Sequence, residues 1–300
     1  MRDEILRRII DTSLPAPRVI VQGATGRAAR MHIRLMRGHG TQIVAGVSPG
    51  KSGEDESLPI FPDCASAVAA TGAQASIVMV PPLSVLPAIC DALAAGLKLV
   101  VTVTEGMPVH DAVRARRAVT EAGAVWIGAS TPGLAVPGRI KLGFLPDVAL
   151  APGSVAIWSK SGTLSYETGR RLVQRGLGQS AWIGVGGDPI KGTRFPDLVP
   201  IFRDHAATHA VVIIGEIGGE EEEDLAEALL REPFGKPVYA ILAGSEAPEG
   251  VTMGHAGAIV SGGRGTLASK TGALRAAGVR VFDAIGPLVD AVEKNLKGQA

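Results

Sequence analysis

His255 lies between glycines in a segment whose residue types suit a nucleophile. The segment runs Met253-Gly254-His255-Ala256-Gly257-Ala258, and Ser261-Gly262-Gly263-Arg264-Gly265-Thr266 follows it closely. Glycines let the backbone approach a ligand, and a neutral imidazole can attack an electrophile near neutral pH. The remaining histidines lie on helix-like or polar stretches, where surface or hydrogen-bonded roles are expected. His255 is therefore the candidate nucleophile, although the local sequence by itself favours an ordinary glycine-rich surface loop.

A second group of small polar residues, Ser159-Lys160-Ser161-Gly162-Thr163-Leu164, follows an expected strand and opens an expected helix. The first N–H groups of a helix have no intrahelical acceptor and readily bind a phosphoryl group. Hydroxyls and a glycine at this position can add further donors. The alternative is a helix start capped by a serine or threonine, which any helix can carry.

A glycine loop near the amino terminus has the same strand, turn and helix setting. The sequence Gln22-Gly23-Ala24-Thr25-Gly26-Arg27-Ala28-Ala29 has the pattern G-x-x-G-x-x-A, a degenerate form of the dinucleotide-binding fingerprint. Its glycines allow a tight turn, and the N–H groups of the helix start can hold a phosphate. Taken alone, the loop is as compatible with a simple turn as with a ligand site.

The next expected strand distinguishes between possible ligands. Nicotinamide enzymes place an acidic residue about 20 residues after the loop to bind the ribose diol, but Thr41–Lys51 contains no acid. The segment ends in Ser48-Pro49-Gly50-Lys51, and a lysine suits a phosphorylated ribose better than a free diol. Coenzyme A carries such a ribose, so coenzyme A is expected here rather than NAD. The alternative for Lys51 is a solvated loop lysine.

The expected elements form two series of strands that alternate with helices. The strands are continuously apolar, which is typical of parallel sheets covered on both faces. Pro-Gly pairs between residues 132 and 153 separate the two series, so we expect two domains, residues 1–135 and 136–300. The expected strands are Arg18–Gln22, Thr41–Val47, Ala75–Val80, Lys98–Val103 and Ala124–Ile127, then Ser154–Trp158, Ser180–Val185, Ala210–Ile214, Pro237–Leu242 and Gly278–Phe282.

Two further segments are assigned ordinary structural roles. The acidic run Glu220–Asp224 fits the solvated first turn of a helix, because carboxylates complement the helix dipole there. The uncharged stretch from Cys64 to Cys90 is long enough to suggest a membrane span. Its prolines and a Thr-Gly pair interrupt it, so a buried strand followed by a helix near Ser84–Ala95 is expected.

The composition excludes several classes of protein. Lys and Arg number 30 against 29 Asp and Glu, a net charge of +1, and 46% of the residues are apolar. This charge does not supply the positive field of a nucleic-acid-binding or polybasic membrane protein. The two cysteines form no CxxC or metal-ligand cluster, so neither a disulfide scaffold nor a metal site is expected. The first residues lack the apolar core of a secretory signal, and a cytoplasmic location is expected.

Several motifs together resemble one enzyme family. From about Arg18 onward the chain is similar to the α subunit of succinyl-CoA synthetase and to related nucleoside-diphosphate-forming acid–CoA ligases. The resemblance implies a Rossmann-like coenzyme A-binding domain followed by a flavodoxin-like doubly wound domain. The motifs that carry it are Met253–Ile259, Gly215-Glu216-Ile217-Gly218-Gly219, Gly184–Pro189, Ser161–Glu167 and Ser48–Lys51.

The resemblance also implies roles for individual residues. His255 is the expected phosphorylated intermediate, and Glu216 the carboxylate that holds its ring. Tyr166 falls where the family lines the substrate site, and the helix start would bind the phosphoryl group. Coenzyme A is expected to contact Thr25, Gly26, Arg27, Ala28, Lys51, Val103, Thr104 and Glu105, and phosphate to contact Ser159, Ser161, Gly162 and Thr163.

One departure from the family pattern affects the expected substrate. The family's Pro-Asn-Cys-Pro-Gly segment is Ala129-Ser130-Thr131-Pro132-Gly133 here. Hydroxyl groups therefore replace an amide and a thiol near the expected thioester. Succinate or another small dicarboxylic acid, such as malate, remains open as the substrate.

The family reaction needs more than this chain. It uses ATP or GTP with Mg²⁺, bound mainly on an ATP-grasp-type β subunit, since no second nucleotide-binding module fits in the remaining residues. Two other classes stay open at this point. One is a dinucleotide-dependent oxidoreductase, which the missing acid after the second strand disfavours, and the other is a noncatalytic coenzyme A-binding protein.

Overall fold

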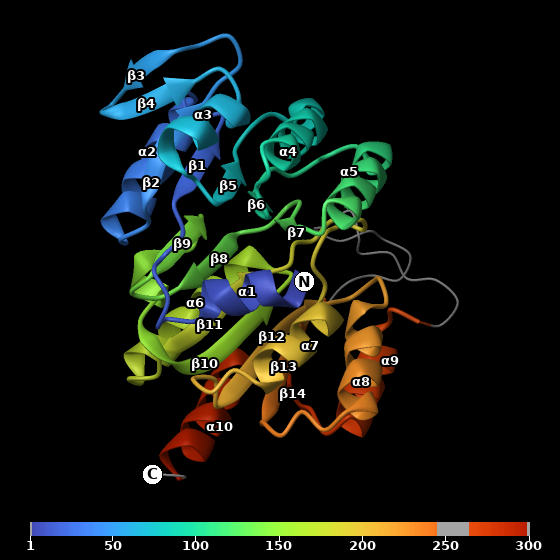
Figure 1. The fold of residues 1–300 in the computed structure, drawn as a ribbon. Helices are drawn as coiled ribbons and strands as arrows, with labels where there is room; N and C mark the ends of the chain where they lie inside the picture. Colours follow the sequence, from blue (N-terminus) through green and yellow to red (C-terminus); the bar gives the residue numbers. More distant parts are fainter. Residues whose placement is uncertain (1, 245–263, 299–300) are drawn as a thin grey trace. The chain divides into compact units, whose positions relative to one another are not determined.

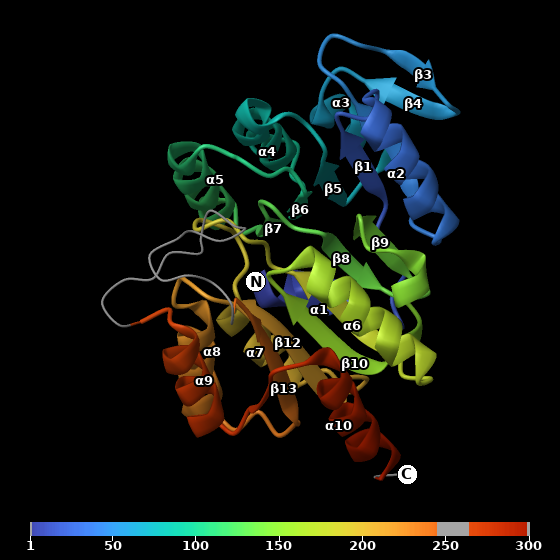
Figure 2. The same cartoon turned by 180° about the vertical axis from the view of Figure 1, so that it is seen from behind.

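The computed structural model describes residues 2–244 and 264–298 (Figures 1 and 2). The chain divides into two compact units. Unit 1 comprises Met1–Leu145 with Ile190–Gly192, and unit 2 comprises Pro146–Pro189 with Thr193–Ala300. Both units are α/β, which confirms the expected fold class. The domain boundary expected at residues 135 and 136 stays a prediction.

Unit 1 contains a seven-stranded sheet in the order β3-β4-β2-β1-β5-β6-β7. Only β3 is antiparallel to its neighbour. The parallel strands, numbered by sequence, follow the order 3-2-1-4-5-6 of dinucleotide-binding folds. Their bounds are β1 Val19–Gln22, β2 Ile43–Val47, β3 Gly53–Asp55, β4 Leu58–Phe61, β5 Ala75–Val78, β6 Leu99–Thr102 and β7 Val125–Gly128.

The helices of unit 1 cover this sheet and bury its apolar strands. Every residue of β1, β5, β6 and β7 is buried, which explains why these strands read as continuous apolar runs. Helices α3, α4 and α5 share one apolar core with the strands. The helices are α1 Arg2–Ile10, α2 Arg27–Gly38, α3 Cys64–Thr71, α4 Val85–Ala94 and α5 Val109–Glu121, with a short 3₁₀ turn η1 at Pro82–Ser84.

Two hairpins were not expected from the sequence. Strands β8 (Gly133–Val136) and β9 (Ile140–Gly143) pair antiparallel, and the turn between them contains a Pro-Gly pair that we interpreted as a domain junction. The other hairpin is β3 and β4, whose turn residues Glu56 and Ser57 have positive φ angles of 48° and 59°. Asn-Gly or Asp-Gly is the usual signal for such a turn, and neither is present here.

Unit 2 contains parallel strands in the order β14-β13-β12-β10-β11. Numbered by sequence, this is the 2-1-3-4-5 order of flavodoxin-like folds. The elements are η2 Asp147–Ala149, β10 Pro152–Ser159, α6 Gly162–Gln174, β11 Gln179–Gly184, α7 Phe195–Arg203, β12 Ala210–Glu216, α8 Glu221–Arg231, β13 Val238–Ala243, α9 Leu267–Ala276, β14 Arg280–Phe282 and α10 Ile285–Lys297.

Helices lie on both sides of the unit 2 strands. Helices α6 and α10 pack together on one side, and α7, α8 and α9 follow one another on the other (Figures 1 and 2). Every residue of β11 and β12 is buried. Among the described helices, none combines the length and the apolar character needed to cross a bilayer.

Candidate functional site

Each unit has one place where the strand order reverses direction. In unit 1 it lies between β1 and β5, and in unit 2 between β10 and β12. Loops leaving the carboxyl ends of two such strands run to opposite faces of the sheet, so a crevice opens between them, where open α/β folds bind ligands. The candidate site residues are therefore sought at these two strand edges.

In unit 1 a cavity of about 520 Å³ lies at the strand reversal. Gln22 and Gly23 from the end of β1, and Val80 and Pro81 beyond the end of β5, line it. Gly23 has a φ of +82°, and a Cβ there would lie 2.4 Å from the carbonyl oxygen of Met79. Only glycine allows the loop to pass this close to the neighbouring strand.

A small polar cluster lies in the wall of this cavity. The Lys51 ammonium donates to Thr25 Oγ1 at 3.1 Å, and the Thr25 and Ser48 hydroxyls are 3.1 Å apart. All three residues line the cavity, and Lys51 is exposed to solvent. The fold thus brings together Thr25 and Lys51, which are 26 positions apart in the sequence.

The other residues expected to bind coenzyme A lie nearby but outside the cavity wall as the described residues define it. Gly26 precedes α2 as its N-cap, and Arg27 and Ala28 form its exposed first turn. The segment Val103–Glu105 follows β6, and the Thr104 hydroxyl donates to the carbonyl of Val80 at 2.7 Å. Thr104 thereby contacts a residue that does line the cavity.

The sequence analysis missed two carboxylates in the cavity wall, Asp63 and Asp91. Asp91 accepts a hydrogen bond from the backbone of Cys64 at 3.0 Å. Asp63 caps α3 by accepting from the backbone of Ser66 at 2.7 Å, and that bond lowers the pKa of Asp63. Both carboxylates thus position α3, and no local motif distinguishes them from surface acids.

A second cavity in unit 1, of about 480 Å³, lies beside the amino-terminal segment. Two of its cations, Lys98 and Arg139, already bind backbone carbonyls. Arg139 donates to Ile9 and Pro15, each at 3.1 Å, and Lys98 donates to Ala122 at 2.8 Å. Arg139 therefore anchors the amino-terminal segment, for which the sequence indicated no role.

In unit 2 the residues that the sequence analysis expected to bind phosphate lie at the strand reversal. Ser159 ends β10 opposite Ile214 of β12, and the N–H of Lys160 donates to the Ile214 carbonyl at 2.9 Å. Ser161 caps α6 by accepting from the backbone of Leu164 at 3.4 Å. Gly162 and Thr163 then form the first turn of α6. Ser159, Ser161, Gly162 and Thr163 are thus assembled at one helix start.

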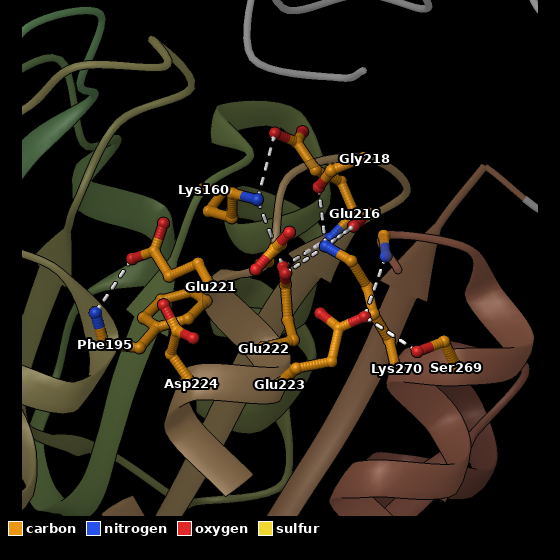
Figure 3. A network of polar contacts seen from close by, with 12 residues as sticks. Lys160, Phe195, Glu216, Gly218, Glu221, Glu222, Glu223, Asp224, Ser269 and Lys270 are labelled. Atoms are coloured by element: carbon orange, nitrogen blue, oxygen red, sulfur yellow. Dashed lines mark hydrogen bonds and ion pairs between the residues drawn. The ribbon is translucent and has the colours of Figure 1, made fainter. Parts of the chain in front are cut away.

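Glu216 ends the neighbouring strand, so the two expected features meet at one edge. Lys160 joins them, because its ammonium lies 3.6 Å from Glu216 Oε1 and 3.3 Å from Glu222 Oε1. Lys160 is 5% exposed and Glu216 is 6% exposed. Figure 3 shows the Glu222 side chain reaching between Lys160 on one side and Lys270 on the other.

Lys270 of α9 contacts the same region by binding backbone carbonyls around Glu216. Its ammonium donates to the carbonyls of Glu216 at 2.8 Å and Gly218 at 2.6 Å, and it also contacts Glu222. Glu222 in turn accepts from the N–H of Glu216 at 3.0 Å. A larger residue at position 215 would displace Glu222, because a Cβ there would lie 2.6 Å from Glu222 Oε1.

For three residues of the acidic run, the expected exposure to solvent was wrong. Glu221, Glu222 and Glu223 do begin α8, but they are only 4%, 0% and 5% exposed. Each accepts hydrogen bonds within unit 2: Glu221 from the N–H of Phe195, and Glu223 from the N–H of Gly265, both at 2.8 Å. Neighbouring helices and turns cover these three side chains, which the sequence analysis assigned to solvent, whereas Glu220 is exposed as expected and Asp224 is half-buried.

For Lys160, Glu222 and Lys270, burial and ion pairing shift the pKa in opposite directions. Burial alone lowers the pKa of Lys160, but the surrounding carboxylates, Glu222 foremost, outweigh it and raise the pKa above its ordinary value. Burial alone raises the pKa of Glu222, but Lys160 and Lys270 outweigh it and lower the pKa. For Lys270, burial prevails over Glu222 and the pKa is lowered. The network is therefore tightly coupled.

Two expected site residues remain. The Tyr166 ring on α6 packs against Trp182, with ring centroids 6.3 Å apart, and burial raises its pKa. His255 lies outside the described residues. The described neighbours of that segment are attached near Glu216, because Ile217 donates to the Ala243 carbonyl at 2.9 Å and Gly218 to the Gly265 carbonyl at 2.8 Å.

Comparison with known proteins relates both units to one family. Residues 16–106 match the CoA binding domain family, and residues 158–280 match the CoA-ligase family. The α subunit 2 of an ADP-forming succinate–CoA ligase from Archaeoglobus fulgidus is 46% identical over 265 residues, 88% of this chain and 92% of that protein. The chain belongs to the family of ADP-forming succinate–CoA ligase α subunits. The family resemblance, the fold class and the enzyme class expected from the sequence are confirmed.

Other relatives extend this family assignment. The corresponding α subunit from Aquifex aeolicus is 43% identical, covering 93% of this chain and 92% of its own length. An ADP-forming sulfoacetate–CoA ligase subunit from Bilophila wadsworthia is 42% identical, covering 88% and 92%. The structure of ATP citrate lyase from Methanothrix soehngenii matches 95% of this chain with a TM-score of 0.86 at 23% identity. The chain spans half the length of that structure, and the likeness shows the fold alone.

Proposed function

We propose that this chain, together with a β subunit, joins a small dicarboxylic acid to coenzyme A at the expense of ATP or GTP, through a phosphohistidine at His255. The observation that supports the proposal is the set of residues at the two strand reversals of this chain, which belongs to an α-subunit family. One has a cavity with a lysine and hydroxyls, and the other has a helix start joined to Glu216.

The cavity of unit 1 suits coenzyme A on physical grounds. Lys51 is exposed at its wall and supported by Thr25, so its ammonium can pair with a phosphate without losing a buried partner. The first turn of α2, which includes Arg27 and Ala28, adds N–H groups of the kind that bind phosphate oxygens. Apolar residues of the cavity wall, among them Val47, Val80 and Pro87, can pack against the rest of the ligand.

The edge of unit 2 suits a phosphoryl group carried by a histidine. The N–H groups that begin α6 can donate to phosphoryl oxygens. Glu216 can accept an N–H from one ring nitrogen of His255, which leaves the other nitrogen free to attack phosphorus. Tyr166 is proposed to line the acid substrate site.

The reaction balances over three transfers. His255 takes the terminal phosphoryl group and releases the nucleoside diphosphate. The carboxylate of the acid then accepts that phosphoryl group as an acyl phosphate, which restores the neutral histidine. Attack of the coenzyme A thiolate on the acyl carbon forms the thioester and releases inorganic phosphate. The covalent intermediate divides one difficult step into easier ones.

The nucleotide and its Mg²⁺ are assigned to the partner. An ATP-grasp-type β subunit would bind them, and Mg²⁺ would neutralise charge on the phosphates during transfer. A cytoplasmic location is proposed, because Cys64 and Cys90 are both free thiols, as expected of a protein in a reducing compartment.

The acid is proposed to be succinate or a hydroxylated relative such as malate. Ser130 and Thr131 supply hydroxyls where the family has an amide and a thiol, and hydroxyls can pair with a polar group that succinate lacks. One relative is named for sulfoacetate, and the kcat/KM values for succinate, malate and sulfoacetate measure the choice of acid.

Labelling of the complex tests the proposal. Incubation with γ-labelled nucleotide is expected to give an acid-labile, alkali-stable phosphoprotein on this chain, and nucleoside diphosphate should reverse the label. His255→Asn should abolish the label and leave coenzyme A affinity intact. His110→Asn, on the exposed surface of α5, is the matched control and should label normally. Full labelling of the His255→Asn protein would exclude the proposed intermediate.

A further inference from the structure

Two buried lysines approach Glu216 in different ways. Lys270 binds the backbone around Glu216 through the carbonyls of Glu216 and Gly218. Lys160 instead faces the Glu216 carboxylate, at 3.6 Å from Oε1 (Figure 3). Lys270 therefore contacts the main chain around Glu216, and Lys160 contacts the Glu216 side chain.

Glu222 lies between the two lysines and connects them. It contacts both ammonium groups and also accepts from the N–H of Glu216. Lys160, Lys270, Glu216 and Glu222 balance in charge, and none is more than 6% exposed. Buried ion pairs are poor net stabilisers compared with apolar packing, so fold stability alone is a weak reason for such a cluster.

We propose that Lys160 is a positioning residue for the phosphorylation step, whose buried ammonium group fixes the Glu216 carboxylate in the orientation that it needs to hold the histidine ring. This inference rests on the proposed function of Glu216 and His255. A carboxylate that orients an imidazole must itself be held, and a supporting contact supplies that order. Glu222 holds Lys160 from the opposite side, at 3.3 Å.

The location of Lys160 links the two parts of the candidate site. It stands between Ser159, which ends β10, and Ser161, which caps α6. Its side chain therefore ties the phosphate-binding turn to the end of β12. The carboxylates that act on it are Glu222, Glu221 and Glu216, and all belong to β12 or the start of α8.

Single-turnover labelling of the αβ complex measures this role. Lys160→Met should slow phosphorylation by on the order of tenfold to a hundredfold, the range expected when a charged contact is lost. The KM for coenzyme A should not change, because that ligand is assigned to unit 1. Lys160→Arg keeps the charge and should retain most of the rate. If Lys160→Met fails to fold, Lys160→Gln, whose amide can still donate, replaces it.

A double-mutant cycle separates positioning from a general structural effect. If Lys160 acts through Glu216, Lys160→Met should add little to the loss already caused by Glu216→Gln. Lys236→Met is the matched control, because Lys236 donates to the Phe202 and His205 carbonyls at 2.6 Å elsewhere in unit 2. Its labelling rate should match that of the wild type.

The outcomes are distinguishable. Wild-type labelling rates in Lys160→Met, or equal losses with and without Glu216→Gln, would overturn the positioning role while the proposed function stands. Slow labelling in Lys160→Met, with little further loss when Glu216→Gln is already present, supports the positioning role. If the wild-type complex carries no label on His255, the proposed function fails, and this inference fails with it.

Discussion

The two strand reversals occupy equivalent places in their sheets but differ in how they use charge. In unit 1 the cation, Lys51, is exposed and contacts a neutral hydroxyl. In unit 2, Lys160 and Lys270 are buried and contact the carboxylates and carbonyls of their own unit. In unit 1 the lysine is available to a ligand, whereas in unit 2 the two lysines pair with groups of the protein itself.

This difference predicts which lysine substitutions change ligand affinity and which change the stability of the fold. An exposed lysine can be removed at little cost to the fold, because solvent already screens it. A buried lysine leaves uncompensated partners behind when it is removed. We therefore expect substitutions in unit 1 to change binding, and substitutions in the unit 2 network to change unfolding free energy as well as chemistry.

The largest effect is expected for Lys270→Met. The substitution leaves the Glu216 and Gly218 carbonyls and one side of Glu222 without their cation, so the free energy of unfolding should fall by about 3 kcal/mol or more. Urea unfolding followed by circular dichroism measures it. Lys297→Met removes an exposed partner of Glu293 and should change stability by less than about 1 kcal/mol. Equal losses in the two variants would remove the contrast between buried and exposed lysines.

The pH dependence of stability should reveal Glu222. Its pKa is lowered from the ordinary value of 4.5, because the two lysines outweigh the effect of burial. A carboxyl group with a lowered folded-state pKa stabilises the fold above its ordinary pKa, and this contribution is lost as pH falls through the folded value. The stability difference between wild type and Glu222→Gln should therefore be largest near neutral pH and shrink below pH 4.5. A difference that stays constant on acidification would contradict this.

A smaller effect is expected for Lys51→Ala, and on binding alone. Loss of one charged contact to phosphate should weaken coenzyme A by roughly tenfold, while unfolding stays within about 0.5 kcal/mol of wild type. Calorimetry with coenzyme A and with NAD measures the affinity. Lys98→Ala removes an exposed lysine at the opposite ends of the strands and should bind normally. Unchanged affinity in Lys51→Ala, or tighter binding of NAD, would refute the assignment.

The smallest effect is expected for Ser130→Asn combined with Thr131→Cys. Ser130 has a φ of +54°, a conformation that asparagine adopts more readily than most residues, so the backbone should tolerate the change. Preference among acids should move toward succinate, measured as the ratio of kcat/KM values for succinate and malate. The Thr131 hydroxyl accepts from the N–H of Gly133 at 2.9 Å. If the ratio does not move, the segment has only that structural role.

Much of the fold could be predicted from local patterns. Every strand that the apolar runs indicated is present, because strands covered on both faces must be apolar throughout. The two hairpins were missed because β3 and β4 are short and their turn lacks a glycine signal, and because the turn between β8 and β9 resembles a linker. Short edge elements depend on their neighbours more than on their own composition.

The sequence by itself determined the parallel strands of both units, because hydrophobic periodicity is a local property. Its motifs carried the resemblance to the family, and the ligand-binding segments that they imply are predictions. Tertiary structure alone decided that Lys160, Glu222 and Lys270 form a buried network, and that Glu221, Glu222 and Glu223 face inward. The amino-acid sequence does not show whether a charged side chain is solvated or buried. Its environment is set by which elements cover it, and β10, β12, α8 and α9 meet there only when the whole unit folds.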